Sequence, residues 1–270
     1  MLRNLRAVVV FISLLTIIGC SKYQRLLKSS DMDAKYDGAV EYYNEEKYDK
    51  ALPLLEELMP LYRGTEKAEK IYYYYCYTNF NLDLLYASSY HFKKFSITYP
   101  TSKHAEEMLF MSAYSNYLLS PSPTLDPTDT YAAINSLQLF VNTFPENELV
   151  DSSNVLMDKL RNKLEVKSYL NAKQYYKIFN YKAAIVALNN TLKDFPETEY
   201  AEEISFLILK SHFLLTENSI KKKKLERIAN TIEAYHTFVD SYGDSKHLKE
   251  AQTILTKMKN LRDKIIIENL

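Results

Sequence analysis

The chain has 270 residues, and its 34 Lys and Arg balance 34 Asp and Glu, so its formal net charge is zero. This balance argues against a dedicated nucleic-acid binder, because such domains carry a strongly basic face. Only four glycines occur in the whole length. Tight β-turns and phosphate-binding loops rely on glycine, so the composition predicts an almost entirely α-helical protein.

The N-terminal segment, residues 1–19, has the pattern of an export signal. A short basic stretch precedes a nearly unbroken apolar run that ends at Ile18. About 12 apolar residues are too few to span a bilayer but suit a signal peptide. The run leads into Gly19-Cys20, which resembles the bacterial lipobox, in which the cysteine is acylated. The resemblance implies a lipid anchor on Cys20 and, because Ser21 follows, sorting to the outer membrane. A plain secretory signal with an incidental cysteine is the alternative.

A tether over residues 20–31 leads into a cassette of about 40 residues, which recurs five times along the chain. The copies align on the position that follows a terminal aromatic residue. These alignment positions are Arg63, Pro100, Pro145, Pro196 and Gly243. Large, mostly apolar residues recur five and eight positions upstream, and small residues recur twelve positions upstream. Such spacing places them on one face of a helix, so each copy ends with a helix that packs on a neighbour.

The junctions after the alignment positions are equally regular. Residues that can cap a helix stand two positions downstream, at Thr65, Ser102, Asn147, Thr198 and Ser245. We expect the side-chain oxygen of each to accept a free backbone N–H at a helix start. Acidic residues follow in the first turn, where the helix dipole favours anions. Each cassette is therefore a helix pair, and five in register predict a stacked array.

In chain order, residues 32–145 are expected to hold three N-terminal repeats, and residues 146–270 two C-terminal repeats and a capping helix. Three prolines within seven residues exclude a helix across the insertion at 120–127. No helix breaker stands between Asn147 and Asn180, which predicts one helix of roughly 30 residues.

A second insertion, around residues 216–224, carries the lysine run Lys221–Lys224. Such a run is usually a solvated segment between helices. Contact with anionic lipid or with an acidic partner surface is the alternative.

The small and aromatic residues of repeat one, Ala39, Tyr42, Tyr48 and Ala51, resemble the tetratricopeptide repeat in their spacing. This resemblance implies an all-α fold, a tetratricopeptide-repeat α-solenoid of five helix pairs with a C-terminal capping helix. The lipobox, the short tether, the five repeats and the junctions at 99–107 and 195–203 together resemble the BamD family. That family provides the lipoprotein subunit of the outer-membrane β-barrel assembly machine.

The resemblance implies a lipid-anchored scaffold on the periplasmic face of the outer membrane. Its C-terminal repeats would bind a BamA-like β-barrel subunit, and its N-terminal repeats would bind unfolded outer-membrane proteins. The sequence contains no metalloprotease, nucleophile-elbow, phosphate-loop or metal-ligand motif, so we expect no enzyme activity and no cofactor or metal. The alternative is another lipid-anchored repeat adaptor, for envelope assembly or glycan uptake. Glycan binding normally uses exposed tryptophan, which this chain lacks.

The first helices of repeats one and two are expected to line a groove, since the family resemblance assigns the concave face to these helices. Eight side chains lie either next to the core positions around the helix or one helical turn further along it. They are Tyr36, Val40, Tyr43, Asn44, Tyr73, Tyr77, Phe80 and Asn81. Aromatic walls with amide ends suit an extended apolar peptide. Packing of these tyrosines against the tether or the neighbouring repeats is the alternative.

The closing helix, expected over about 246–267, ends in a triple isoleucine flanked by basic residues. The residues expected to dock a partner are Lys257, Arg262, Lys264, Ile265, Ile266 and Ile267. An apolar end rimmed with positive charge suits a protein partner better than open water, and the family resemblance names that partner as a BamA-like subunit. The alternative is that the isoleucines fold back on repeat five.

Overall fold

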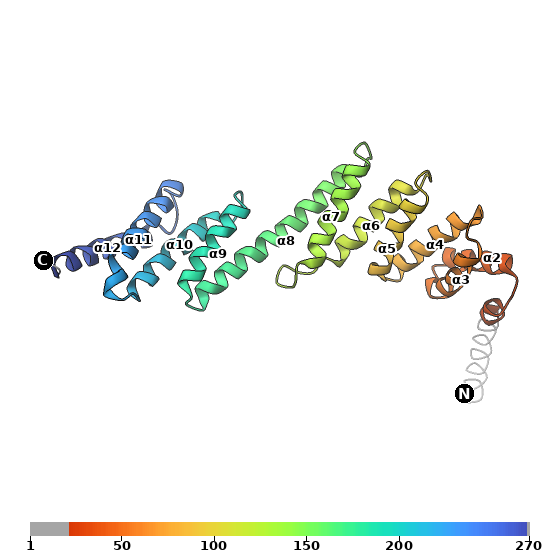
Figure 1. Cartoon of the computed structure of the whole chain (residues 1–270), viewed down its shortest axis with the longest axis horizontal. Helices are drawn as coiled ribbons and strands as arrows, with labels where there is room; N and C mark the ends of the chain where they lie inside the picture. The colour runs from red at the N-terminus through yellow and green to blue at the C-terminus, as the bar shows by residue number, and fades with distance from the viewer. Residues whose placement is uncertain (1–21, 269–270) are drawn as a thin grey trace, which may run out of the picture. The chain divides into compact units, whose positions relative to one another are not determined.

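The computed structural model describes residues 22–268, and this part of the chain consists of helices and turns without a strand (Figure 1). The expected signal peptide and Cys20 lie outside the described residues. The helices are α2 (Met32–Asn44), α3 (Tyr48–Leu61), α4 (Lys67–Asn81), α5 (Leu85–Thr98), α6 (Ala105–Leu119), α7 (Thr128–Thr143), α8 (Val150–Lys177), α9 (Tyr181–Asp194), α10 (Ala201–Glu217), α11 (Lys221–Ser241) and α12 (Leu248–Glu268).

Helices that follow one another along the chain pack together, α2 on α3, α4 on α5, α6 on α7 and α10 on α11. Successive pairs also pack on each other, since α3 contacts α4 and α5 contacts α6. This sequential packing of antiparallel pairs confirms the expected all-α solenoid of the tetratricopeptide-repeat type. The closing helix α12 packs on α11 and α10.

The repeat slots expected to pack between helices are buried in all five repeats. The small residues twelve positions upstream are at most 1% exposed, and they are Ala51, Ser88, Ala133, Ala184 and Thr231. The larger residues eight and five positions upstream are buried as well. Small residues let two helix backbones approach, and the large residues fill the space beside them, so one sequence period builds one layer of core.

The chain divides into two compact units. The first comprises the residues up to Pro121 together with Thr128–Leu160, and the second comprises Ser122–Pro127 together with the residues from Arg161 onward. The 28-residue helix α8, whose length confirms the expected long helix, contributes to both.

Each half of α8 joins a different core. Met157 and Leu160 pack with α6 and α7 in the first unit. Tyr169 and Ala172 pack with α9 and α10 in the second unit.

The proline-rich insertion contains no helix, as expected. Ser120 and Thr130 share a hydrogen bond of 2.9 Å across the base of this loop. The Lys167 Nζ donates to the Leu125 carbonyl oxygen at 2.6 Å, which attaches the loop tip to α8.

The junction residues do not serve as helix N-caps, so that expectation is wrong in detail. Each stands about three residues before its helix, because one further turn of chain separates it from the first helical residue. There the Ser102 Oγ accepts from the His104 backbone N–H at 3.1 Å, and the Ser245 Oγ accepts from the His247 N–H at 3.0 Å. The side chains therefore stabilise the turn that leads into the helix rather than the helix end itself.

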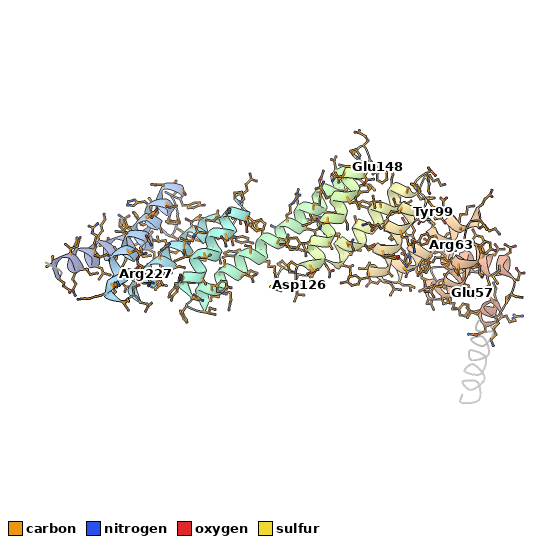
Figure 2. All side chains as sticks on the ribbon, in the orientation of Figure 1. Glu57, Arg63, Tyr99, Asp126, Glu148 and Arg227 are labelled. Carbon is orange, nitrogen blue, oxygen red and sulfur yellow. The ribbon has the colours of Figure 1, made fainter. Side chains whose placement is uncertain are left out.

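Four of the five junction side chains also reach back to the preceding layer, where each donates to a glutamate on a first helix. These four bonds, called here the junction ladder, join Ser102 to Glu69 (2.6 Å), Asn147 to Glu106 (2.5 Å), Thr198 to Glu165 (2.5 Å) and Ser245 to Glu202 (2.7 Å). Figure 2 labels Arg63 and Tyr99, which stand at the first two junctions. The ladder repeats along the chain because each layer presents the same donor and acceptor to the next.

The lysine run is not an insertion between helices. Ile220 has an extended backbone with ψ of 151°, and Lys221–Lys224 form the first turn of α11 directly after it. The interpretation as a solvated loop is therefore wrong, because the helix starts at the first lysine of the run rather than after the last one.

Candidate functional site

The first helices of the first three pairs, α2, α4 and α6, carry a row of half-buried aromatic side chains. We call this row the aromatic surface, and its members are Tyr36, Tyr43, Tyr73, Tyr77, Phe80, Phe110, Tyr114 and Tyr117. Each of these side chains is partly buried and partly exposed. Such partly covered rings can accept a ligand without unfolding.

Between α2 and α4 the row is held by edge-to-face ring contacts. The Tyr43 ring centroid lies 4.8 Å from that of Tyr74 and 5.5 Å from that of Tyr48. The Lys67 Nζ lies 5.2 Å from the centre of the Tyr36 ring. These contacts orient the rings because edge-to-face and cation–π geometries are directional.

Between α4 and α6 the row continues through both polar and apolar contacts. The Tyr73 ring lies 4.6 Å from His104, and the Tyr77 hydroxyl donates to Glu107. Phe80 has its ring centroid 6.3 Å from that of Tyr114. Three helices that are distant in sequence therefore present one aromatic surface.

The predicted groove residues that are not aromatic lie at its margins. Asn44 and Asn81 are exposed at the C-terminal ends of α2 and α4, and Val40 is half-buried on α2. The structure thus brings the predicted aromatic residues together and sets the two amides at the helix ends. It also packs the rings on one another, which is the alternative foreseen for them.

Burial raises the pKa of the Tyr43 and Tyr77 hydroxyls, and the neighbouring Glu107 adds to the effect on Tyr77. Both hydroxyls therefore stay protonated at physiological pH. The Tyr77 hydroxyl already donates its proton to Glu107, so of the two only the Tyr43 hydroxyl can donate to a peptide carbonyl.

Sequence reasoning missed the part of the surface on α6. Phe110, Tyr114 and Tyr117 stand 10, 14 and 17 positions after Pro100, just as Tyr73, Tyr77 and Phe80 stand after Arg63. The repeat register would have found them. Tyr74 and Glu107 were also missed, because their roles depend on contacts between helices.

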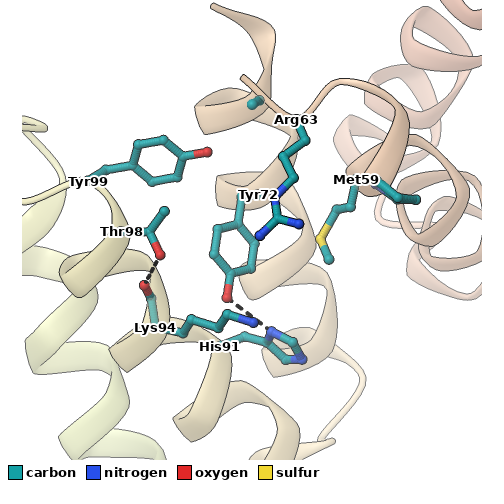
Figure 3. A pocket seen from close by; sticks show the side chains of 9 residues that line it. Met59, Arg63, Tyr72, His91, Lys94, Thr98 and Tyr99 are labelled. Carbon is teal, nitrogen blue, oxygen red and sulfur yellow. Dashed lines mark hydrogen bonds between the residues drawn. The ribbon is translucent and has the colours of Figure 1, made fainter. Parts of the chain in front are cut away.

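A pocket of about 320 Å³ lies elsewhere in the first unit, among α3, α4 and α5 (Figure 3). Arg63 and Lys94 line it together with the buried Tyr72, whose hydroxyl lies 3.1 Å from the His91 Nδ1. Burial lowers the pKa of His91, and the charge of Lys94 lowers it further. The pocket is positively lined, and none of the eight predicted groove residues lines it.

The expected docking residues of α12 divide between core and surface. Ile265 is 7% exposed and packs in the same cluster as Leu255 and Met258. The prediction that Ile265 contacts a partner is therefore wrong. Ile265 stands seven residues after Met258 and shares its buried helix face. Ile266 and Ile267 are 46% and 72% exposed.

The basic residues around this end are exposed as well. Lys257 places its Nζ 5.6 Å from the Phe213 ring centre. Arg262 pairs with Asp263 at 3.1 Å, and Lys264 lies 4.0 Å from Glu268. Nearby carboxylates therefore offset part of the positive rim.

The model of the YfiO family, described as an outer membrane lipoprotein family, matches residues 28–228 of the chain. The chain belongs to the YfiO family. It is accordingly an outer-membrane lipoprotein by family. The matched range contains the whole aromatic surface and ends within α11. A comparison with curated proteins finds no match.

Within residues 22–268, no helix combines the length and the apolar character needed to cross a membrane.

Proposed function

We propose that this chain is a lipid-anchored scaffold of the β-barrel assembly complex on the periplasmic face of the outer membrane. Cys20 carries the acyl chains of the anchor. The N-terminal repeats bind unfolded outer-membrane proteins, and the C-terminal end binds a BamA-like barrel-forming subunit. Membership of the YfiO family supports the setting, and the aromatic surface is the observation that supports the binding role.

The aromatic surface suits an extended strand whose side chains alternate between apolar and polar. Rings on α2, α4 and α6 offer apolar area to alternate residues of such a strand. Tyrosine hydroxyls, with Asn44 and Asn81 at the margins, can pair with the strand's backbone groups. An unfolded barrel protein supplies this kind of segment, because barrel strands alternate apolar and polar residues.

Removing two rings should weaken this binding. We expect Tyr43→Ala combined with Tyr77→Ala to lower the affinity for a C-terminal peptide of a barrel protein at least tenfold, or about 1.4 kcal/mol. The matched control is Tyr86→Ala with Tyr90→Ala, because these tyrosines are 67% and 59% exposed on α5, outside the aromatic surface. Fluorescence anisotropy of the labelled peptide measures both.

Tyr77 also packs on Phe92, with centroids 5.1 Å apart, so the alanine pair requires a folding check by circular dichroism. Tyr43→Leu with Tyr73→Leu keeps more apolar volume and serves if the alanine pair unfolds. Equal affinity in the folded surface variant and in the α5 control would remove the aromatic surface as the binding site.

The C-terminal docking role can be tested without disturbing the core. A deletion of α12 would strip buried residues such as Ile254 and Met258 from the second unit, whereas Ile266→Ser with Ile267→Ser changes exposed side chains. We expect this pair to reduce co-purification of a large β-barrel subunit from gently solubilised outer membranes. Val155→Ser, at a residue 54% exposed on α8, is the control.

Undiminished recovery of the barrel subunit with the serine pair would exclude this docking site. Recovery of a transporter in place of a barrel subunit, already with the unsubstituted chain, would favour the glycan-uptake adaptor.

A further inference from the structure

The turn between α8 and α9 exposes large apolar side chains at its tip. Ile178 is 55% exposed and Phe179 is 76% exposed. Lys177 and Lys182 flank them and are exposed too. Two such side chains at one tip, with lysines on either side, have no role in covering the core of this unit.

The backbone at Phe179 makes the choice of residue more unusual. Its φ is 63°, in the left-handed region that bulky residues rarely adopt. The equivalent turns of the first two pairs carry Glu46 and Asp83 there, with φ of 58° and 59°. The Phe179 ring has its centroid 6.3 Å from that of Tyr181 and is otherwise open. A strained position that exposes an aromatic ring points to a binding role rather than to stability.

The turn between α10 and α11 repeats this chemistry. Ile220 is 68% exposed, and the run Lys221–Lys224 follows it at once. Four positive charges in the first turn of a helix oppose the helix dipole. Arg227, labelled in Figure 2, fixes this turn by donating to the Leu215 carbonyl oxygen at 3.3 Å.

Both turns lie at the same edge of the second unit. α9 runs back from the first turn and α10 returns toward that edge, because successive helices of the array are antiparallel. Figure 1 shows the α8–α9 and α10–α11 turns at this shared edge, opposite the α9–α10 turn. We call the two tips, residues 174–182 and 218–225, the basic apolar edge.

Positive charge predominates at this edge, with the exposed Glu217 and Glu226 bordering the second tip. The first tip contains two lysines and the second contains four, six in all, and neither contains an acidic residue. Lys221 is paired with Glu268 at 3.2 Å. Exposed apolar and aromatic tips between cationic side chains match the interface of an anionic bilayer, where rings and aliphatic groups enter the headgroup layer and lysines lie on phosphates.

We propose that the basic apolar edge binds the surface of an anionic lipid bilayer directly, in addition to any acyl anchor. Phe179, Ile178 and Ile220 enter the headgroup layer, and the lysines contact lipid phosphates. Membership of an outer-membrane lipoprotein family places the chain beside a membrane, and the excess of lysines at the two tips favours lipid phosphates as their partners.

The test uses the full-length lipidated chain in vesicles whose lipids carry a fluorescence quencher. A fluorophore is attached at Gln174→Cys, which is exposed at the start of the first tip. The matched position is Glu197→Cys, exposed at the α9–α10 turn of the same unit. In phosphatidylglycerol vesicles we expect at least twofold stronger quenching at position 174 than at position 197. The difference should vanish in phosphatidylcholine vesicles and at high salt.

Two further variants separate binding from folding. Phe179→Asn should abolish the excess quenching and leave the melting temperature unchanged or raised, since Asn tolerates the left-handed region. Lys222→Gln with Lys223→Gln should weaken the contact about fivefold per lysine. Equal quenching at positions 174 and 197, insensitivity to Phe179→Asn, or protection of position 174 only when a protein partner is added would each overturn the proposal.

Discussion

Lys35 shows how a single charge is accommodated inside the first unit. Its side chain is 2% exposed, and its Nζ lies 2.5 Å from the Glu57 Oε1. Glu57, labelled in Figure 2, stands on α3 and is 42% exposed. Glu57 therefore supplies a charge that compensates the buried ammonium, while keeping part of its own hydration. Such a pair fixes the packing of α2 on α3 more than it adds net stability.

Removing Glu57 alone should lower the free energy of unfolding more than removing both charges of the pair does. We expect Glu57→Ala to lower the free energy of unfolding by about 2–3 kcal/mol, because it leaves a buried ammonium unpaired. Lys35→Met, which keeps the volume and removes the charge, should be near neutral. Urea denaturation of the two single variants and the double variant measures the coupling.

If Lys35→Met does not rescue Glu57→Ala in the double variant, the loss comes from packing on α3 and not from the unpaired charge.

At the scale of the elements, the junction ladder explains how a longer helix fits the repeat. By position, Asp151 would accept from Thr198, but the observed acceptor is Glu165, which lies 14 residues later. Fourteen residues make almost four helical turns, so Glu165 faces the same way as Asp151. Tyr169 also stands 14 residues after the position, Val155, that corresponds in the repeat to Tyr73 on α4. It stacks on Tyr200 with ring centroids 4.3 Å apart. α8 therefore carries whole extra turns that preserve the contact to the next layer.

The ladder bond at Ser102 should contribute measurable stability. Ser102→Ala removes the donor to Glu69 and the acceptor for the His104 N–H. We expect a loss of about 1 kcal/mol in the free energy of unfolding. Thr65→Ala is the matched control, because the Thr65 hydroxyl donates to the Tyr62 carbonyl oxygen and not to a glutamate.

Chemical denaturation compares the two variants. A Thr65→Ala loss as large as that of Ser102→Ala would mean that the turn, and not the contact between layers, carries the stability.

At the scale of the whole molecule, each compact unit contains a partly buried histidine. Burial lowers the pKa of His91 in the first unit and of His212 in the second, below the ordinary value of 6.5. An unfolded chain therefore takes up protons at these sites at a higher pH than the folded protein does. The contribution of the two neutral histidines to the free energy of unfolding is fully present above about pH 6.5. It is lost as the pH falls from there toward the folded pKa values.

We expect the urea midpoint at pH 5.5 to lie below that at pH 7.5, and His91→Gln with His212→Gln to reduce this difference. His236→Gln, at an exposed histidine, is the control. The bond to Lys173 lowers the pKa of Glu203, so the contribution of Glu203 to stability is lost only below about pH 4.5. It therefore does not affect the comparison between pH 5.5 and pH 7.5. An unchanged pH dependence in the double variant would assign the effect to other groups.

The sequence by itself determined the repeat period, the buried slots such as Ala51 and Phe92, the long helix α8 and the closing helix. These features follow from helical spacing and residue size. Both can be recognised within one or two helical turns, so a single cassette is enough to predict them. The aromatic residues of α2 and α4 could be predicted from the sequence for the same reason.

Only the tertiary structure decided which groups meet between layers. It extended the aromatic surface to α6, placed Ile265 in the core and joined Thr198 to Glu165 rather than to Asp151. It also put Lys221–Lys224 on the first turn of a helix, and the α10–α11 turn at the same edge as the α8–α9 turn. Such contacts depend on the relative rotation and length of whole helices. A spacing pattern constrains one helix face at a time, and the sum over neighbouring helices fixes which side chains finally touch.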